Sequence, residues 1–379
     1  MREAYITNHN IISSLGFSSE ENFNHLVAEE SGIQKYQRDN GDSYYSSQVD
    51  KIKVDELFSK IGDVNAYTTL EKMMILSINS VLKESKLKIT EKTGLILATT
   101  KGNVDTLSPK SKFDKDSHRS YLPELGKQIQ QFFDFKNDAI VLSNACVSGV
   151  LAVAVAQRLV SDGMYNNVIV VGGDLVSEFI LSGFTSFQAI SDQPCKPFSK
   201  NRTGITIGEA VASVLISSKK SNNAVQIIGA GSCNDANHIS GPSRTGEGLF
   251  LSVKSALNEA ELKADEIDYI SAHGTATNFN DEMEAVAFGR LKMLKTPINS
   301  LKGYYGHTLG ASGLLETIIG IESLQNNTLI ASKGFDELGV SESINVIEKT
   351  EIKDLKVFLK TASGFGGCNT AVIFRKIGD

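Results

Sequence analysis

One order of helices and strands occurs twice along the chain, and it restricts the fold more than any other feature. Apolar runs in the first half predict strands at 94–100, 139–145, 167–174 and 210–218, with one helix at 70–84 and another after the second strand. The second half repeats this order with a helix at 249–262, a strand at 267–274, a strand, glycine-rich turn and helix over 296–324, and two strands over 357–374. Apolar strands without polar alternation are typical of sheets covered by helices on both faces. The repetition therefore predicts an α/β protein of two related halves, 1–222 and 223–379.

Size and composition restrict where the protein works. The 379 residues suffice for two domains or one duplicated domain. No apolar run reaches the roughly 20 residues that span a bilayer, and the N-terminus lacks the order of a signal peptide. Four cysteines without a C-x-x-C pair indicate free thiols in a reducing, cytoplasmic setting. The net charge of −6 argues against non-specific binding to nucleic acid.

The stretch "SNACVSG" (143–149) places Cys146 where a strand gives way to a helix. A free cysteine is most often a buried packing residue, and that interpretation stays open here. A helix N-terminus, however, carries partial positive charge and unpaired N–H groups, which favour the nucleophilic thiolate. Those N–H groups also suit the stabilisation of an oxyanion.

A histidine follows the strand of the second half, in "SAHGTATNFNDEMEA" (271–285). His273 is either a packing residue or a ligand-facing group, and the adjacent Gly274 favours the second because it permits close approach. Thr275 and Thr277 add hydroxyl groups next to it. Asp281 and Glu284 lie at the start of the next predicted helix, where carboxylates act as caps.

A second histidine, His307, opens a predicted helix within the glycine-rich segment "NSLKGYYGHTLGASGLLE" (299–316). Two glycines in the first turns of the helix after His307 cost stability, which indicates close helix packing. Lys302 is either a solvated surface residue or a buried lysine paired with a carboxylate. The apolar surroundings favour the buried pair, with Glu316 as its partner.

Glycines also surround Phe365 in "SGFGGCNTA" (363–371), where they permit a positive φ or close approach by a ligand. A buried aromatic packing residue is the alternative. The sequence contains no zinc-type ligand spacing, no P-loop and no G-x-S-x-G elbow, so we expect no metal site.

Together these stretches resemble the elongating β-ketoacyl-acyl carrier protein (ACP) synthases of the thiolase superfamily. The resemblance runs from about Asn10 to Phe374, and its most specific parts are "NACVSG", "AHGTATNFND" and "LKGYYGHTLGASGLLE", in that order. It implies a thiolase-like fold in which two duplicated halves form a five-layered α-β-α-β-α core. It also implies a homodimer, or a heterodimer with a related synthase or chain-length factor.

The resemblance also implies roles for the residues above. Cys146 would accept an acyl chain from the phosphopantetheine of ACP, and His273 and His307 would promote decarboxylation of a malonyl thioester and stabilise its enolate. The backbone N–H groups of Cys146 and Phe365 would form an oxyanion hole, and the Phe365 side chain would gate the acyl chain. Lys302 with Glu316 would organise the histidines, and Asp281 would support the site from behind them. Thr275 and Thr277 would donate hydrogen bonds to the pantetheine arm. No metal or redox cofactor would be required.

Departures from the family pattern leave the pathway and two other functions open. The chain has "GEA" (208–210) where the family usually has "GEG", and Lys196 where arginine is usual, which favours a specialised pathway such as aryl polyene or flexirubin-type pigment synthesis. One alternative is a chain-length-factor-like partner subunit, which usually lacks the nucleophilic cysteine. The other is a thiolase or an initiating synthase. A loop with Lys110, Lys112, Lys115 and Arg119 is either a docking patch for the acidic ACP or an ordinary solvated loop, because Asp114 and Asp116 dilute its positive charge.

Overall fold

The computed structural model describes residues 2–38, 41–113, 118–235 and 241–378. The helices of this described part are α1 (Ser19–Val27), α2 (Lys51–Phe58), α3 (Thr69–Ser85), α4 (Leu122–Phe133), α5 (Ser148–Ser161), α6 (Glu178–Ser186), α7 (Glu247–Ala260), α8 (Asn278–Arg290), α9 (Lys302–Tyr305) and α10 (Ser312–Asn326), with 3-10 turns η1 (Val104–Leu107), η3 (Ala264–Glu266) and η4 (Leu309–Ala311).

An 11-stranded sheet runs in the order β13-β11-β10-β15-β16-β9-β1-β8-β6-β4-β5. Its strands are β1 (Ala4–Ile12), β4 (Thr93–Ala98), β5 (Ile140–Leu142), β6 (Asn167–Asp174), β8 (Ala210–Ser217), β9 (Val225–Asn234), β10 (Tyr269–Ser271), β11 (Pro297–Asn299), β13 (Asn345–Val346), β15 (Val357–Ser363) and β16 (Cys368–Lys376). Two small sheets contain β2 (Ile33–Gln37), β3 (Ser43–Ser47) and β7 (Ile207–Gly208), and β12 (Thr328–Leu329) with β14 (Glu351–Ile352).

The pairing pattern of the large sheet shows the duplication. In the first half β1 and β8 are antiparallel, β8 and β6 are antiparallel, and β6, β4 and β5 are parallel. The second half repeats this pattern with β9, β16, β15, β10 and β11. The halves join where β1 pairs with β9. The predicted thiolase-like fold of two duplicated halves is confirmed, whereas 222/223 as a domain boundary stays a prediction.

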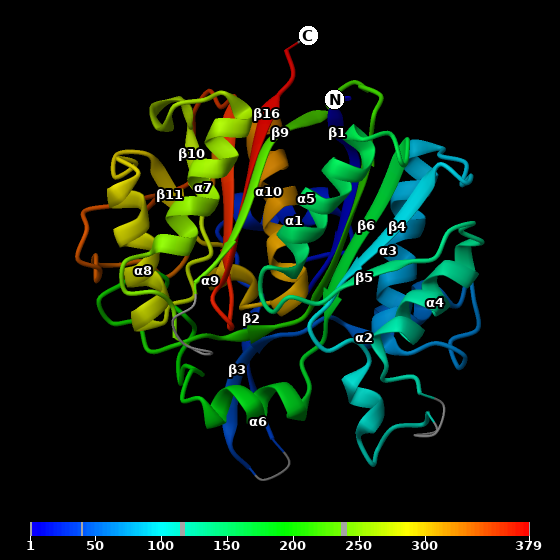
Figure 1. The fold of residues 1–379 in the computed structure, drawn as a ribbon. Coiled ribbons are helices and arrows are strands. Elements are labelled where there is room, and N and C mark those ends of the chain that lie inside the picture. The colour runs from blue at the N-terminus through cyan, green and yellow to red at the C-terminus, as the bar shows by residue number, and fades with distance from the viewer. Residues whose placement is uncertain (1, 39–40, 114–117, 236–240, 379) are drawn as a thin grey trace.

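Helices α5 and α10 form the middle layer between the two halves of the sheet (Figure 1). Alternating strand residues divide the core accordingly, because Ile96 and Val168 face this middle layer while Leu95 and Ile169 face an outer layer with α3. A further core under α7 and α8 covers the outer face of the second half. The result is the expected five-layered α-β-α-β-α arrangement.

Glycines let the two middle helices approach closely. A Cβ at Gly149 of α5 would lie 2.7 Å from the backbone nitrogen of Leu314, and one at Gly313 of α10 would lie 2.9 Å from the nitrogen of Val150. Both helices begin at the site described below, so their contact fixes the distance between the segments that precede them. The helix packing expected from the glycines near His307 is therefore confirmed.

The sequence predicted the helices and strands around the site within a few residues but missed others. Strands β1 and β9 went unrecognised, although they lie at the centre of the large sheet, and so did helices α1, α2, α4 and α6. His307 does not open a helix, because η4 intervenes and α10 begins only at Ser312. Among the described residues, no helix combines the length and apolar character needed to cross a membrane.

Candidate active site

Cys146 lies in the tight connection between β5 and α5. Ala145 before it has a positive φ of 45°, and α5 begins two residues later, at Ser148. The Ser148 hydroxyl accepts a hydrogen bond from the Asn144 N–H at 2.8 Å and donates one to the Ala145 carbonyl at 2.7 Å. This closed turn directs Cys146 into a cavity of about 500 Å³.

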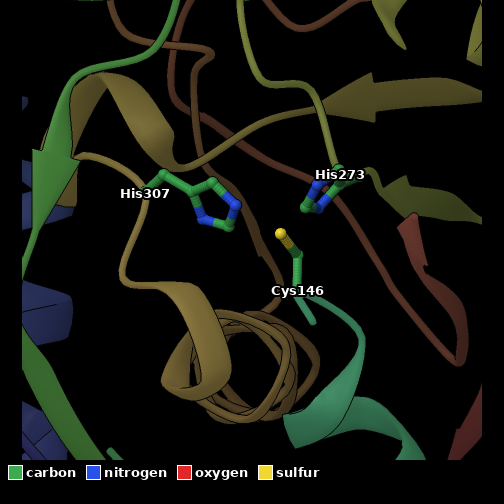
Figure 2. A group of neighbouring side chains, drawn as sticks. All are labelled: Cys146, His273 and His307. Atoms are coloured by element: carbon green, nitrogen blue, oxygen red, sulfur yellow. The ribbon is translucent and has the colours of Figure 1, made fainter. Parts of the chain in front are cut away.

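The structure brings Cys146, His273 and His307 together (Figure 2). The sulfur and one ring nitrogen from each histidine lie within 4.8 Å of one another, and all three side chains are buried. The two imidazoles meet edge to face, with ring centroids 5.2 Å apart and an interplanar angle of 81°. The sulfur lies beside both rings, and all three residues line the cavity.

Hydrogen bonds at Nδ1 define the tautomer of both histidines. Nδ1 of His307 accepts the backbone N–H of Leu309 at 3.3 Å, and Nδ1 of His273 lies 3.5 Å from the Nζ of Lys302, which can only donate. Each neutral ring therefore carries its proton on Nε2. The Nε2 of His307 is buried without a hydrogen-bond partner among the described residues, so it is available to a ligand.

Burial keeps both imidazoles uncharged. It lowers the pKa of His273 well below the usual value, with further lowering by Lys302, His307 and Lys360. Burial also lowers the pKa of His307 to about 3, helped by Lys302 and Lys360 and opposed by Glu316. At neutral pH the site therefore presents two neutral N–H donors.

Lys302 is buried and paired with Glu316, as the apolar surroundings of the segment suggested. Its Nζ donates to Glu316 Oε1 at 2.8 Å and also to the carbonyl oxygen of His273. Glu316 reaches this position from the second turn of α10, where Ser312 also donates to it at 3.0 Å. Burial opposes ionisation of Glu316, but Lys302 and Lys360 outweigh it and hold the pKa of that carboxyl below its usual value.

Asp281 and Glu284 do not cap their own helix, so that part of the prediction is wrong. Glu284 accepts the N–H of His273 at 2.8 Å and that of Gly274 at 2.7 Å. Asp281 accepts the N–H of Thr275 at 2.9 Å and that of Phe198 at 2.7 Å. Both carboxylates thus reach back from α8 to hold the loop that carries His273.

Phe365 lies over the nucleophile on the turn between β15 and β16. Its backbone N–H donates to the Cys146 sulfur. Its ring lies 5.8 Å from that of Phe184 and 5.5 Å from that of Phe187, and 36% of the residue is exposed. Since Phe365 is only partly covered and lines the cavity, the structure favours the ligand-facing interpretation over the buried packing residue.

Thr275 and Thr277 line the same cavity as the three residues above. Their hydroxyl oxygens lie 2.8 Å apart, and Thr277 directly precedes α8. The pair thus presents hydroxyl groups on the wall of the cavity beside His273.

These features agree with comparisons to known proteins. The beta-ketoacyl synthase N-terminal domain matches residues 2–222, and the beta-ketoacyl synthase C-terminal domain matches residues 224–336. The chain belongs to the beta-ketoacyl synthase family. It is an acyltransferase-type enzyme of fatty-acid or polyketide synthesis.

Relatives match the chain over nearly its whole length, and solved structures share its fold. A putative mitochondrial 3-oxoacyl-[acyl-carrier-protein] synthase of Schizosaccharomyces pombe is 26% identical, and the match covers 99% of each protein. The ketosynthase ApeO, solved with its chain length factor ApeC from Xenorhabdus doucetiae, superposes with a TM-score of 0.89 at 24% identity over 99% of this chain and 98% of that one. The ishigamide ketosynthase/chain length factor gives a TM-score of 0.89 at 21% identity over 100% of both chains.

The position of Cys146 near a helix N-terminus predicted a lowered thiol pKa in this synthase, and that prediction is wrong. Burial, with a smaller contribution from the neighbouring Cys368, raises the pKa of Cys146 to about 12 against lowering by Lys302, the Phe365 N–H and Lys101. In this buried pocket desolvation outweighs the helix N-terminus. The resting side chain is therefore a thiol that must lose its proton as it reacts.

Two polar residues of the site were missed from the sequence. Lys360 of β15 is fully buried and forms an ion pair with Glu316 at 2.6 Å. Asp174, at the end of β6, accepts the N–H of Gly310 at 2.7 Å and the Thr99 hydroxyl at 2.9 Å, and so ties the segment after His307 to the first half. The sequence feature that could have revealed them is a charged residue inside or at the end of an apolar strand, in "VFLKTAS" and "VIVVGGD".

The cysteine and the two histidines are donor types that zinc accepts. The electrostatics of the pocket oppose a cation there, because the ammonium groups of Lys302 and Lys360 lie beside His273 and share the single carboxylate of Glu316. The trio therefore suits thioester chemistry better than metal binding.

Part of the proposed basic docking patch is committed to internal contacts. The guanidinium group of Arg119 pairs with the buried Glu71, with an Nη2–Oε2 distance of 2.6 Å, which favours a structural role for this residue. Lys112 donates to Asn65 at 3.3 Å, and Lys115 lies outside the described residues. A docking role for the loop stays a prediction.

Proposed function

We propose that the chain catalyses decarboxylative condensation between an acyl group carried on Cys146 and malonyl-ACP. One observation carries the proposal: a buried thiol lies beside two neutral imidazoles, and the Nε2–H of His307 has no hydrogen-bond partner among the described residues. A thiol suits acyl transfer because the thioester it forms is a good leaving group in the next step. The N–H donors are fixed where negative charge develops on a thioester oxygen.

The proposed reaction has two half-reactions. In the first, the Cys146 sulfur attacks the acyl-ACP thioester, loses its proton and releases the phosphopantetheine thiol, while the N–H groups of Cys146 and Phe365 stabilise the oxyanion. In the second, malonyl-ACP loses CO₂ and forms an enolate whose oxygen accepts hydrogen bonds from His273 and His307. The enolate carbon attacks the acyl carbonyl, the Cys146 thiolate leaves and regains a proton, and β-ketoacyl-ACP is released.

The cavity wall supplies the remaining proposed contacts. Thr275 and Thr277 are placed to bind the amide groups of the phosphopantetheine arm, because their hydroxyls line the route past His273. Phe365 is placed to gate the acyl chain between Phe184 and Phe187. Phe179, on the same helix α6 as Phe184, is 60% exposed and is not among the residues that line this cavity. The chemistry requires no metal or redox cofactor.

We propose further that the enzyme works in a specialised pathway, such as aryl polyene synthesis, and pairs with a second synthase-like chain. Support comes from ApeO and the ishigamide ketosynthase, since both of these solved structures contain a chain length factor. The presence of the cysteine and both histidines argues that this chain is the catalytic member of such a pair.

Mass spectrometry of the purified protein tests the proposed function. After incubation with acyl-ACP, we expect the peptide that contains Cys146 to gain the mass of the acyl group, and addition of malonyl-ACP should then remove it and yield β-ketoacyl-ACP. The assay is run with the protein alone and with a co-expressed partner chain, because the proposal includes a second synthase-like chain. Acylation at another residue, or none in either preparation, would overturn the proposal.

The pH dependence of malonyl-ACP decarboxylation follows from the lowered histidine pKa values. The neutral imidazole is the reactive form, so the histidines cause a loss of activity when the pH falls through their folded-state pKa, which lies below the ordinary 6.5 for both. We expect no acid limb from the histidines between pH 8 and 5.5 in the rate at saturating malonyl-ACP; a loss in this range should come from the carboxyls that hold the His273 loop, because burial raises the pKa of Glu284 to about 7 and that of Asp281 to about 6. Circular dichroism controls for unfolding, and an acid limb with a midpoint near 6.5 that persists in the Glu284→Gln variant would contradict the histidine assignment.

A further inference from the structure

Lys360 is a buried charge that the proposed mechanism has not yet used. It interrupts the apolar strand β15, and it is 0% exposed. Moving an ammonium group into a protein interior costs several kcal/mol unless ion pairs and hydrogen bonds compensate. Such a residue within an otherwise apolar strand calls for a role that a leucine or valine could not fill.

Lys360 contacts the segment that carries His273 and the carboxylate of Glu316. On β10, Ser271 pairs with Lys360 in the register of the sheet. The Nζ of Lys360 donates to the carbonyl oxygens of Ser271 and Ala272, both at 3.1 Å, and Lys302 donates to the next carbonyl, that of His273. Glu316 joins the two lysines, with one carboxylate oxygen on each.

The two sides of the His273 segment are thus held by opposite charges. Ammonium groups hold three consecutive carbonyl oxygens, while the carboxylate of Glu284 holds the N–H groups of His273 and Gly274. With every one of these backbone groups fixed, the ring of His273 has little freedom to move away from Cys146. The Lys302–Glu316 pair alone would leave the carbonyls of Ser271 and Ala272 without these two hydrogen bonds.

We propose that Lys360 is a positioning residue for His273, which fixes the backbone on which the imidazole stands and adds positive charge that disfavours its protonation. This inference rests on the proposed function, in which His273 donates to the enolate oxygen. Lys360 itself does not touch the substrate in this proposal, because it lies behind His273 and is not among the residues that line the cavity. Its effect should therefore fall on the malonyl half-reaction and spare acylation of Cys146.

The charges around His273 give the direction of the pH effect. The groups that face it are Lys302 of α9, Lys360 of β15, Glu316 of α10, Glu284 of α8, His307 and Cys146. Removal of the Lys360 charge leaves Lys302 and Glu316 as a neutral pair. Protonation of His273 then becomes easier, so the acid limb of decarboxylation should move to higher pH.

The test compares the two half-reactions in the full-length Lys360→Met variant. Methionine keeps most of the side-chain length without the charge, and Lys356→Met, at a position with 75% side-chain exposure, is the matched control. We expect decarboxylation of malonyl-ACP to fall about 10- to 100-fold, as a displacement of about 1 Å can cause, with acylation of Cys146 within about twofold of the wild type. The acid limb should lie at higher pH than in the wild type and the control.

Two outcomes would overturn the inference. One is decarboxylation within about twofold of the wild type, and the other is an equal loss in both half-reactions, which indicates only general disruption. If Lys360→Met does not fold, Lys360→Gln keeps a donor for the carbonyls and removes only the charge; we then expect a smaller loss of decarboxylation and the same shift of the acid limb to higher pH, and an unshifted acid limb would overturn the inference. Failure of the wild type itself to acylate Cys146 or to decarboxylate malonyl-ACP would instead count against the proposed function.

Discussion

Replacement of Cys146 by alanine is expected to abolish acylation and to lower condensation by about 10⁴-fold or more, while decarboxylation of malonyl-ACP persists within about threefold. The reason is that the two half-reactions use different atoms of one cavity. Acylation needs the sulfur, whereas the N–H donors for the enolate belong to His273 and His307. Acyl-enzyme mass and release of labelled CO₂ measure the two steps separately.

The histidine variants provide the reciprocal control. His307→Ala removes the imidazole with the unpartnered Nε2, and we expect decarboxylation to fall about 10²- to 10³-fold, the usual cost of one oxyanion donor. Acylation of Cys146 should continue. If Cys146→Ala and His307→Ala lose both half-reactions equally, the division of roles between sulfur and imidazoles is wrong.

The sequence allowed the fold and the chemical groups of the site to be predicted because both depend on local pattern. Fully apolar strands and glycine-rich turns recur in the same order in both halves, so the duplication could be read without coordinates. Cys146 and His273 follow strands and His307 follows the short helix α9, all three in glycine-containing stretches. Cys146, His273 and His307 therefore stood out one by one, and the resemblance gave their relation.

What the sequence could not provide was the charge network behind these residues. Lys360 and Ser271 lie 89 positions apart, and only the pairing of β15 with β10 brings them together. Asp281 and Glu284 fit a helix start as well as they fit a loop anchor, so their partners could not be chosen from spacing. The state of Cys146 likewise depended on the balance between burial and its helix, which a pattern of letters does not contain.

That network also predicts the largest effect on stability, in the variant Glu316→Ala. Glu316 is the carboxylate shared by two buried ammonium groups, so its removal leaves Lys302 and Lys360 without their ion pair. Breaking a buried pair by removing one partner costs about 3–5 kcal/mol in the free energy of unfolding. Chemical denaturation should show this loss, whereas Glu247→Ala, which breaks a partly exposed pair with Arg290, should change stability by about 1 kcal/mol or less.

A second substitution distinguishes two causes of the lost stability, uncompensated buried charge and lost packing. If the cost of Glu316→Ala arises from two uncompensated ammonium groups, adding Lys360→Met removes one of them and should recover part of the lost stability. The two single variants and the double variant form a cycle whose interaction free energy should be about 1–3 kcal/mol, as for residues in one charged network. Purely additive losses would show that the lysines do not depend on Glu316 for their burial, and that the carboxylate contributes to the site by packing alone.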